Sequence, residues 1–435
     1  MIITVPGDKS ISHRALLLSV LAEGTSELSG LLPGADCRST ASVMRALGAS
    51  MPDLPPDGSE IRVPGVGPKG LRSPKGELDC GNSGTTARLL LGLLAGLSIE
   101  ATLTGDASLR SRPMRRVTDP LSRMGARFEE GPKEDRLPLT VRGGGLSPFS
   151  YRSPVASAQV KSALLLAGLT GGVAVEVEEP ERSRDHTERM LRRIGCRVEE
   201  GTGEAGWRVR LAEIPRALRP LDFHVPGDFS SAAFFLALAL LGGAGSALRI
   251  TNVGLNPTRT GLLDVLREMG GRIEVERQRE TDDPAGEPAA DLIAYPSELR
   301  GVTIGGEVIP RLIDEVPILA VVGARARGVT EIRDAEELRV KESDRVRVLV
   351  ENLGTLGADV EERPDGLRVS GHDRPLQGSI AVHHDHRIAM AFGVLGALPG
   401  QNVVVDDPEV ADVSFPGFWR LLAECAGAVE GGRAS

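Results

Sequence analysis

Six segments of the chain are almost continuously apolar over two to three helical turns, and each begins at a short polar stretch. An apolar segment without a polar face predicts a buried helix rather than an amphipathic surface helix. The polar stretches are rich in Ser, Thr, Asp and Asn, the residues that cap helix N-termini. The six predicted helix starts lie within residues 6–18, 82–91, 157–166, 227–236, 314–320 and 384–392.

A second pattern alternates with the first. A leucine-rich segment runs into a glycine, which suits the left-handed position after a helix, and then into a charged segment that alternates like a strand. Copies recur every 70 to 87 residues by subtraction, so the chain contains six α/β units in which helices lead into strands. The predicted helix-ending glycines are Gly48, Gly125, Gly195, Gly270, Gly357 and Gly427.

A repeated tetrapeptide divides the six units into two sets of three. Val5-Pro-Gly-Asp8 recurs as Val225-Pro-Gly-Asp228, which is 220 residues later and close to half the chain. Two similar domains are therefore expected. The one long spacing between helix-ending glycines contains residues 277–291, which are charged and carry Pro and Gly, and this composition predicts an exposed hairpin insertion rather than a domain linker.

Composition narrows the classes of function. The net charge is −9 and only 3% of residues are aromatic, which does not suit a nucleic-acid binder. The longest apolar stretch, 232–241, is too short to span a membrane, and the N-terminus does not look like a signal peptide. The four cysteines are far apart, without the spacing of a zinc site or a disulfide framework. A cytoplasmic protein is expected.

Cations stand at several of the predicted helix starts and in the polar loops between elements. Helix N-termini carry partial positive charge, so several of them facing one cleft would bind anions. A single arginine near a helix start is more often solvated, but recurrence across the units favours a small phosphate or carboxylate ligand. These cations are Lys9, Arg14, Arg88, Lys161 and Arg387 at helix starts, and Arg112 and Arg184 in loops.

Three further motifs allow two interpretations each. On a helix over 338–346, Lys341 and Glu342 would lie beside Arg345, either as an exposed ion-pair ladder or as part of a site. Asp314 is either a helix N-cap or a catalytic base. The histidines of 383–386 could share a metal ion, although an Asp-capped helix start that presents Arg387 to an anion is favoured.

These residues fall into motifs that together resemble the 5-enolpyruvylshikimate-3-phosphate synthase family, in order and over Val5 to about Trp419. The resemblance implies two inside-out α/β barrel domains, each of three βαβαββ repeats, with the active site in the cleft between them. It places residues 1–7 and 228–435 in one domain and 8–227 in the other, with hinges near 8 and 227. The motifs are Pro6-Gly-Asp-Lys-Ser-Ile-Ser-His-Arg14, Gly81-Asn-Ser-Gly-Thr-Thr-Ala-Arg88, Ser111-Arg-Pro113, Ser157-Ala-Gln-Val-Lys-Ser-Ala163, Arg339-Val-Lys-Glu-Ser-Asp-Arg345 and Asp385-His-Arg-Ile-Ala-Met390.

The family transfers the enolpyruvyl group of phosphoenolpyruvate to the 5-hydroxyl of shikimate 3-phosphate without metal or organic cofactor, and a monomer is expected. The resemblance assigns catalysis to Lys9, Asp314 and Glu342. It assigns shikimate 3-phosphate binding to Lys9, Ser10, Arg14, Ser157, Gln159, Arg184, Asp314 and Lys341. It assigns phosphoenolpyruvate binding to Lys9, Gly84, Arg112, Gln159, Arg345 and Arg387.

Two alternatives remain at this point. A related enolpyruvyl transferase acts on UDP-N-acetylglucosamine, but that enzyme carries a cysteine in the loop before its Arg-Pro, and residues 105–113 contain none. A non-catalytic repeat scaffold that binds anionic partners would also be periodic. Identical cations in every unit would favour the scaffold, whereas here each unit contributes different polar residues.

Overall fold

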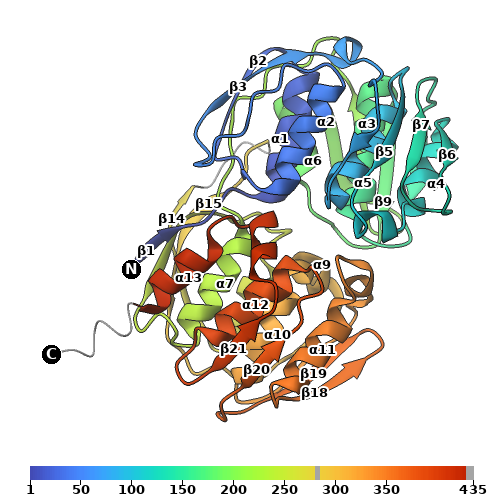
Figure 1. Cartoon of the computed structure of the whole chain (residues 1–435). Helices are drawn as coiled ribbons and strands as arrows, with labels where there is room; N and C mark the ends of the chain where they lie inside the picture. The colour runs from blue at the N-terminus through green and yellow to red at the C-terminus, as the bar shows by residue number, and fades with distance from the viewer. Residues whose placement is uncertain (280–284, 428–435) are drawn as a thin grey trace. The chain divides into compact units, whose positions relative to one another are not determined.

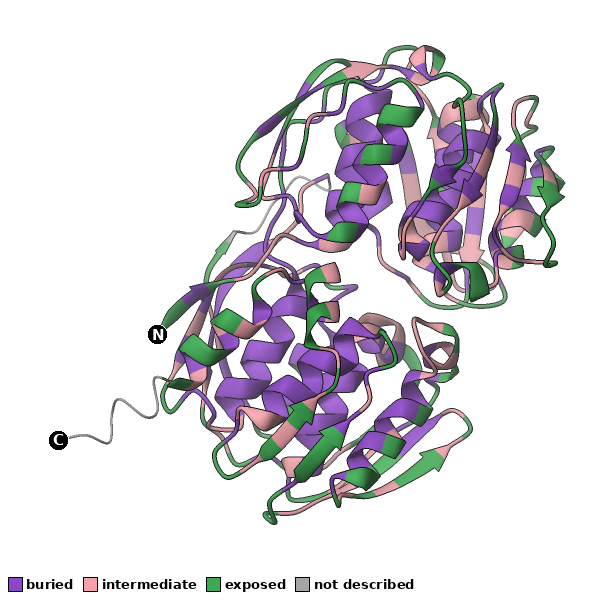
Figure 2. Ribbon diagram, viewed as in Figure 1, coloured by how far each residue is buried: buried purple, intermediate pink, exposed green. Residues whose placement is uncertain are grey.

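Six helices are buried over most of their length in the computed structural model, and they are the helices that the apolar segments predict (Figures 1 and 2). The structure describes residues 1–279 and 285–427. All 12 residues of the fourth buried helix are buried, which explains why its sequence has no polar face. The buried helices are α1 (Lys9–Leu21), α3 (Gly84–Ala95), α5 (Ala158–Gly171), α7 (Phe229–Leu240), α10 (Val316–Arg325) and α12 (His386–Gly396).

Five of these helices begin at a side-chain cap. The side chains of Asp8, Ser83, Ser157, Asp228 and Asp385 each accept a hydrogen bond from a backbone N–H of the first turn. The helix α10 differs, because Glu315 precedes it without such a bond and Asp314 lies in the 3-10 turn η4 (Ile313–Glu315). The interpretation of Asp314 as an N-cap is therefore wrong, and its carboxylate is left for other contacts.

The helices with one exposed face end as the glycine pattern predicts in five of six copies. After the first five, Gly48, Gly125, Gly195, Gly270 and Gly357 adopt φ between 91° and 120°. The sixth copy differs because Gly427 is the last residue of its helix, and the strand predicted after it lies outside the described residues. These helices are α2 (Ala35–Ala46), α4 (Arg115–Met124), α6 (His186–Arg193), α8 (Gly261–Glu268), α11 (Arg345–Thr355) and α13 (Phe418–Gly427), and a short α9 (Ile309–Leu312) adds one turn.

The strands of the described residues form six sheets. Their bounds are β1 (Ile2–Thr4), β2 (Glu23–Ser29), β3 (Ile61–Val66), β4 (Leu78–Asp79), β5 (Glu100–Thr104), β6 (Arg127–Glu130), β7 (Leu139–Arg142), β8 (Phe149–Arg152), β9 (Val175–Glu179), β10 (Arg197–Thr202), β11 (Trp207–Glu213), β12 (Phe223–His224), β13 (Leu248–Gly254), β14 (Arg272–Arg279), β15 (Ala289–Tyr295), β16 (Thr303–Ile304), β17 (Gly328–Ile332), β18 (Asp359–Arg363), β19 (Gly366–Gly371), β20 (Gln377–Ile380) and β21 (Asn402–Val405). The strand orders are β12-β2-β3, β4-β5-β7-β6, β10-β11-β9-β8, β1-β13-β15-β14, β16-β17-β19-β18 and β20-β21.

Each sheet contains one parallel pair of strands, and the other pairings are antiparallel. In four sheets the parallel strands flank one buried helix along the chain, as β4 and β5 do around α3; between β16 and β17 the short α9 precedes the buried α10. The other two sheets have exchanged their first strands. β1 precedes α1 but pairs with β13, which follows α7, and β12 precedes α7 but pairs with β2, which follows α1.

This exchange coincides with the division of the chain into two units. Unit 1 comprises Met1–Pro6, Pro226–Glu280 and Pro288–Ser435, and unit 2 comprises Gly7–Val225 with Thr281–Glu287, of which 285–287 are described. Each unit has its own hydrophobic core around three buried helices. A Cβ on Gly7 would lie 1.7 Å from the carbonyl oxygen of Gly30, so only glycine fits at the first crossing.

The charged segment 277–291 forms the hairpin that its composition predicts, because β14 and β15 pair antiparallel. Its predicted exposure is confirmed at Arg277 and Gln278 and wrong at Ala285 and Asp291, which are buried. The Asp291 carboxylate pairs with Arg249 at 3.1 Å, and residues 280–284 lie outside the described residues. Among the described helices, none is long and apolar enough to cross a bilayer.

Candidate functional site

The N-termini of the three buried helices of unit 2 meet at one end of that unit. Arg88 of α3 donates to Gln159 Oε1 of α5 at 3.0 Å, and Gln159 Nε2 donates to Thr85 Oγ1 of α3 at 3.1 Å. Arg14 of α1 donates to Ser162 Oγ of α5 at 2.8 Å. The partial positive charges of three helix ends therefore add at one place, as an anion site requires.

Arg14 is buried there and is held by neutral oxygen atoms. Its Nε donates to Thr187 Oγ1 at 2.6 Å, and its terminal nitrogens donate to the Ser10 carbonyl and to Ser162. The pKa of Arg14 is lowered to about 10: burial is the largest cause and the neighbouring Arg184 acts in the same direction, whereas Glu188 and Asp8 partly offset them. The guanidinium is still charged at neutral pH, and these hydrogen bonds do not neutralise it.

Gly84, the first residue of α3, lies against two guanidinium groups. A Cβ on Gly84 would lie 2.8 Å from NH1 of Arg88 and 3.3 Å from NH1 of Arg112. Arg112 is held by Asn82 Oδ1 at 2.5 Å and by Ser108 Oγ at 3.1 Å. Absence of a side chain at this helix start therefore leaves room for the two guanidinium groups and for an anion beside them.

Lys9 begins α1 and pairs with Asp36 of α2, with 3.1 Å between Nζ and Oδ2. The two side chains are only 15% and 9% exposed, so the ammonium group is fixed rather than mobile in solvent. We name the cation cluster of unit 2 from its members: Lys9, Arg14, Arg88, Arg112, Arg116 and Arg184.

One predicted member does not belong to this cluster. Lys161 of α5 is fully buried and pairs with Glu179 and Glu188, each at 2.9 Å. Burial alone would lower the pKa of Lys161, but the two carboxylates raise it. The prediction that Lys161 presents its charge to an anion is wrong, because its charge is already balanced inside the protein.

The three buried helices of unit 1 also meet at their N-termini. Ser230 of α7 donates to Glu315 before α10 in a short hydrogen bond. Arg387 of α12 donates from NH1 to the carbonyl oxygen of Asp314 at 3.0 Å. The Asp385 carboxylate that caps α12 also accepts from Nε of Arg345 at 2.8 Å.

Asp314 lies at the centre of this arrangement. Its carboxylate oxygens are 3.5 Å from Arg345, 3.8 Å from Arg259, 3.9 Å from Arg387 and 4.0 Å from Lys341. It is 15% exposed, so a ligand can reach it. We name the mixed-charge cluster of unit 1 from its members: Arg259, Asp314, Glu315, Lys341, Glu342, Arg345, Asp385 and Arg387.

The predicted helix over 338–346 is wrong. A 3-10 turn, η5 (Glu336–Val340), ends before Lys341, and α11 begins at Arg345 because Asp344 caps it. Glu342 nevertheless pairs with Arg345, with 2.6 Å between Oε2 and NH2. Burial would lower the pKa of Arg345, but Asp385 and Glu342 raise it, so this guanidinium is permanently charged.

Arg259 and Arg116 join the two clusters without having been predicted. Arg259 is 3% exposed and donates to Ser230 Oγ at 2.7 Å, and Arg116 donates to Gln159 Oε1 at 3.1 Å. A signal for Arg259 was present in the repeats. It stands two residues before α8, as Arg184 stands two residues before α6, and Arg112 occupies the corresponding loop before α4.

The predicted residues therefore form two groups, one in each unit. The cleft between the two domains stays a prediction. The group in unit 2 is Lys9, Ser10, Arg14, Gly84, Arg112, Ser157, Gln159 and Arg184; the group in unit 1 is Asp314, Lys341, Glu342, Arg345 and Arg387.

A group of three residues that could bind a metal ion lies outside 383–386. Asp185, His186 and Glu287 have ligand atoms within 4.8 Å of one another, and no other group of three such residues is found in the described part of the chain. Asp185 already pairs with Arg182 and Arg189 at 2.8 and 2.9 Å, and His186 Nδ1 lies 2.7 Å from Glu287. Two guanidinium groups at the cluster disfavour a divalent cation there.

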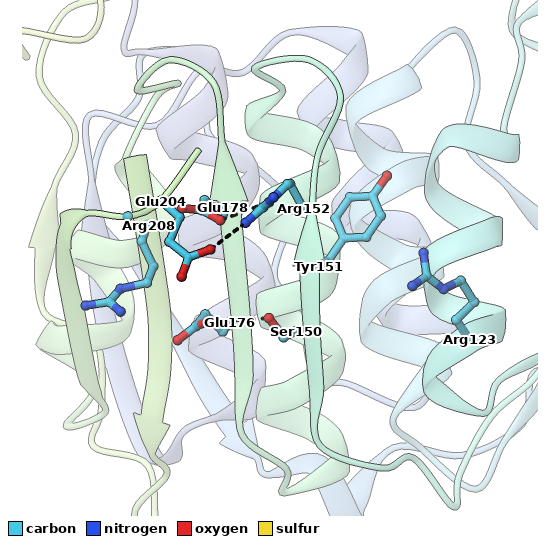
Figure 3. Close-up of a pocket in the computed structure, with 9 residues that line it drawn as sticks. Arg123, Ser150, Tyr151, Arg152, Glu176, Glu178, Glu204 and Arg208 are labelled. Carbon is cyan, nitrogen blue, oxygen red and sulfur yellow. Dashed lines mark hydrogen bonds and ion pairs between the residues drawn. The ribbon is translucent and has the colours of Figure 1, made fainter. Parts of the chain in front are cut away.

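A surface depression of about 540 Å³ lies over β8, β9 and β11 (Figure 3). Arg152 pairs there with Glu178 and Glu204, each at 3.2 Å. None of the predicted site residues lines it, and its cross-strand ion pairs are those of a solvated sheet face.

Comparison with known proteins gives matches along nearly the whole chain. The family model for EPSP synthase (3-phosphoshikimate 1-carboxyvinyltransferase) matches residues 1–422. The 3-phosphoshikimate 1-carboxyvinyltransferase of Gloeobacter violaceus is 52% identical over 423 residues, which cover 97% of this chain and 95% of that protein. The enzyme of the same name from Geobacillus kaustophilus is 48% identical over 422 residues, which cover 97% and 96%.

Two solved structures are similar along the same length. EPSP synthase from Acinetobacter baumannii has a TM-score of 0.82 and 39% identity, covering 98% of this chain and 95% of that one. The enolpyruvyl transferase NikO from Streptomyces tendae has a TM-score of 0.76 and covers 98% and 94%; at 19% identity it shares the fold.

Proposed function

Because the chain belongs to the EPSP synthase (3-phosphoshikimate 1-carboxyvinyltransferase) family, we propose that the clusters of its two units are the two halves of one active site. The chain is a transferase of the shikimate pathway, and it moves the enolpyruvyl group of phosphoenolpyruvate to shikimate 3-phosphate with release of phosphate. The proposal rests on one observation. In each unit, the N-termini of three buried helices meet and carry the residues that the family resemblance assigns to the site.

Each unit is, in this proposal, an inside-out barrel of three βαβαββ repeats that works as a domain. The two strand exchanges at β1 and β12 support hinges near residues 8 and 227, because the chain passes from unit 1 to unit 2 after Pro6 and back to unit 1 after Val225, next to the exchanged strands. Closure of a cleft between the domains would exclude water from two anionic substrates. A monomer is sufficient for this arrangement.

Both substrates are anions, and each would be bound by residues of both clusters. Shikimate 3-phosphate and phosphoenolpyruvate each carry a phosphate and a carboxylate, so side by side they repel each other. Fixed cations and helix N-termini offset that repulsion. The ligands of shikimate 3-phosphate would be Lys9, Ser10, Arg14, Ser157, Gln159, Arg184, Asp314 and Lys341, and those of phosphoenolpyruvate Lys9, Gly84, Arg112, Gln159, Arg345 and Arg387.

The chemistry needs an acid and a base. Glu342 would deliver a proton to the methylene carbon of phosphoenolpyruvate, which makes the adjacent carbon electrophilic, while Asp314 accepts the proton of the attacking 5-hydroxyl. The tetrahedral adduct then loses a methyl proton and the phosphate together, which restores the double bond. Lys9 would share in these proton transfers, since its ammonium group is fixed beside Asp36.

Phosphate release from phosphoenolpyruvate tests the acceptor. Phosphate should appear with shikimate 3-phosphate and stay at the no-acceptor background with UDP-N-acetylglucosamine. Equal release with both acceptors, or release only with the nucleotide sugar, would remove the assignment. Small-angle scattering tests the cleft, because shikimate 3-phosphate with a phosphoenolpyruvate-competitive inhibitor should reduce the radius of gyration; an unchanged radius contradicts closure.

A further inference from the structure

A buried group of three charged side chains lies directly behind the residues that would bind shikimate 3-phosphate. Lys161 pairs with Glu179 and with Glu188, and all three side chains are at most 1% exposed. They come from the start of α5, the end of β9 and the start of α6 (Figure 1). We call them the buried triad. None of them can touch a substrate, so the assigned chemistry leaves them without a role.

Glu179 fixes two polar segments at once. Its Oε1 accepts from the backbone N–H of Ser157 at 2.8 Å, and both of its oxygens accept from Ser183 Oγ, at 2.9 and 2.7 Å. Ser157 caps α5, and Ser183 directly precedes Arg184 in the loop between β9 and α6. One carboxylate therefore sets the positions of two segments that each carry an assigned ligand of shikimate 3-phosphate.

The other two members strengthen the same attachment. Lys161 donates from Nζ to the carbonyl oxygen of Ser183 at 3.2 Å, so that both the side chain and the backbone of Ser183 are held. Glu188 follows Thr187, whose hydroxyl accepts from Nε of Arg14. The triad thus contacts or adjoins the segments that carry Ser157, Arg184 and Arg14, and it lies on the unit 2 side only.

Stability alone does not account for three buried charges. Removing two carboxylates and an ammonium group from water is unfavourable, and well-packed apolar residues of similar volume are often at least as stable. Burial also raises the pKa of Glu188, against the effect of Lys161, which indicates how strongly this place disfavours charge. The hydrogen bonds that Glu179 accepts do, however, fix two backbone segments in a single arrangement.

We propose that Glu179, supported by Lys161 and Glu188, is a positioning residue that holds Ser157 and Arg184 for shikimate 3-phosphate and acts on that substrate selectively. The proposal rests on the proposed function, because it takes the assignment of Ser157 and Arg184 from it. The phosphoenolpyruvate ligands Gly84 and Arg112 lie on α3 and in the loop before α4, and none of the hydrogen bonds or ion pairs of the triad described above reaches them.

The test is steady-state phosphate release by the full chain, with each substrate varied at saturation of the other. Glu179→Ala should raise the KM for shikimate 3-phosphate at least about tenfold, since hydrogen bonds that hold charged-ligand positions are lost. The KM for phosphoenolpyruvate should change less than about threefold. Glu179→Gln keeps an oxygen for the Ser157 N–H and should recover most of the loss. Glu178→Ala is the matched control, because Glu178 precedes Glu179 on β9 but pairs with Arg152 on the solvent face.

Equal increases in both KM values, or no increase, would overturn the proposal. If Glu179→Ala fails to fold, Ser183→Ala decides, because it removes only the hydroxyl that Glu179 holds; an unchanged KM for shikimate 3-phosphate in that variant overturns the proposal as well. Ser157→Ala and Arg184→Ala distinguish failure of the site assignment from failure of the positioning role. If neither weakens shikimate 3-phosphate, the site assignment fails and the positioning role with it, whereas weakening by both with no effect of Glu179→Ala refutes the positioning role alone.

Discussion

Substitution of Gly84 by alanine adds one methyl group, and its effect on substrate binding can be worked out from the distances between that methyl group and its neighbours. The added Cβ would lie 2.8 Å from NH1 of Arg88, and ordinary contacts begin at 3.4 Å, so that nitrogen must retreat by about 0.6 Å. NH1 of Arg88 now donates to Gln159 Oε1 at 3.0 Å. A retreat of this size takes the pair beyond hydrogen-bond distance.

The expected loss is that of one hydrogen bond from a charged donor, about 1.5–3 kcal/mol. The lower value applies, because Arg116 still donates to the same oxygen of Gln159 at 3.1 Å. Since 1.4 kcal/mol corresponds to a factor of ten, the KM for phosphoenolpyruvate should rise about tenfold. The KM for shikimate 3-phosphate should rise less than the KM for phosphoenolpyruvate, because both substrates share Gln159 but the contacts of Arg14 and Ser157 are not disturbed.

The assay is phosphate release with phosphoenolpyruvate varied at saturating shikimate 3-phosphate, and then the reverse. Gly76→Ala is the matched control, since a Cβ at Gly76 would meet nothing within 4 Å. An unchanged KM for phosphoenolpyruvate in Gly84→Ala, or a parallel rise for both substrates, would show that Gly84 does not line the phosphoenolpyruvate site.

Three further outcomes are expected. Arg387→Ala and Lys9→Met should each lower kcat/KM at least about 100-fold in the phosphate assay while the thermal unfolding temperature stays near the parent value; near-normal turnover would refute the assignment. Glu342→Gln should slow turnover about 100-fold with the KM for phosphoenolpyruvate within about threefold, and normal turnover would remove Glu342 from proton transfer. Burial, with Lys9 and Arg14 nearby, lowers the pKa of His13 from 6.5 to about 3. Below pH 6.5 the imidazole is therefore protonated in the unfolded chain but not in the folded chain, so the free energy of unfolding falls as the pH drops. Between pH 6.5 and 4.5 this amounts to about 2 kcal/mol, and urea unfolding should show His13→Asn losing less stability than the parent over that range; equal losses contradict the assignment.

The sequence predicts the parts of this fold that depend on local conformation. Glycine after a helix is needed because φ is positive there, and Gly48 or Gly195 can be identified without knowing what surrounds them. The buried helices can also be predicted from local sequence, since a helical segment with no polar face is buried in the core of its unit. The break before Arg345 was missed because residues 338–346 contain neither glycine nor proline, and only the cap at Asp344 marks the start of α11.

Charges that meet over long separations could not be predicted in this way. Lys161 has the same sequence context as a cation at an exposed helix start. Its partners Glu179 and Glu188 come from other elements, and nothing in the composition around Lys161 indicates that both lie at 2.9 Å. The position of Lys161 near a helix start was predicted correctly, but its burial beside two carboxylates makes its predicted role in anion binding wrong.

The loops before α4, α6 and α8 each carry an arginine, and the charges around these arginines differ between the two units. Arg112, Arg184 and Arg259 occupy equivalent loops, but their surroundings differ. Hydrogen bonds in unit 2 join Arg14 and Arg112 to neutral oxygens, whereas Arg259 in unit 1 lies 3.4 to 3.9 Å from the carboxylates of Asp228, Asp314 and Glu315. Unit 2 thus holds Arg14 by neutral oxygen atoms, and unit 1 holds carboxylates in place beside cations. We therefore expect substitution of Arg14 or Arg184 to act mainly on KM and substitution of Asp314 or Glu342 mainly on kcat, because the first two are assigned to binding and proton transfer needs a fixed carboxylate.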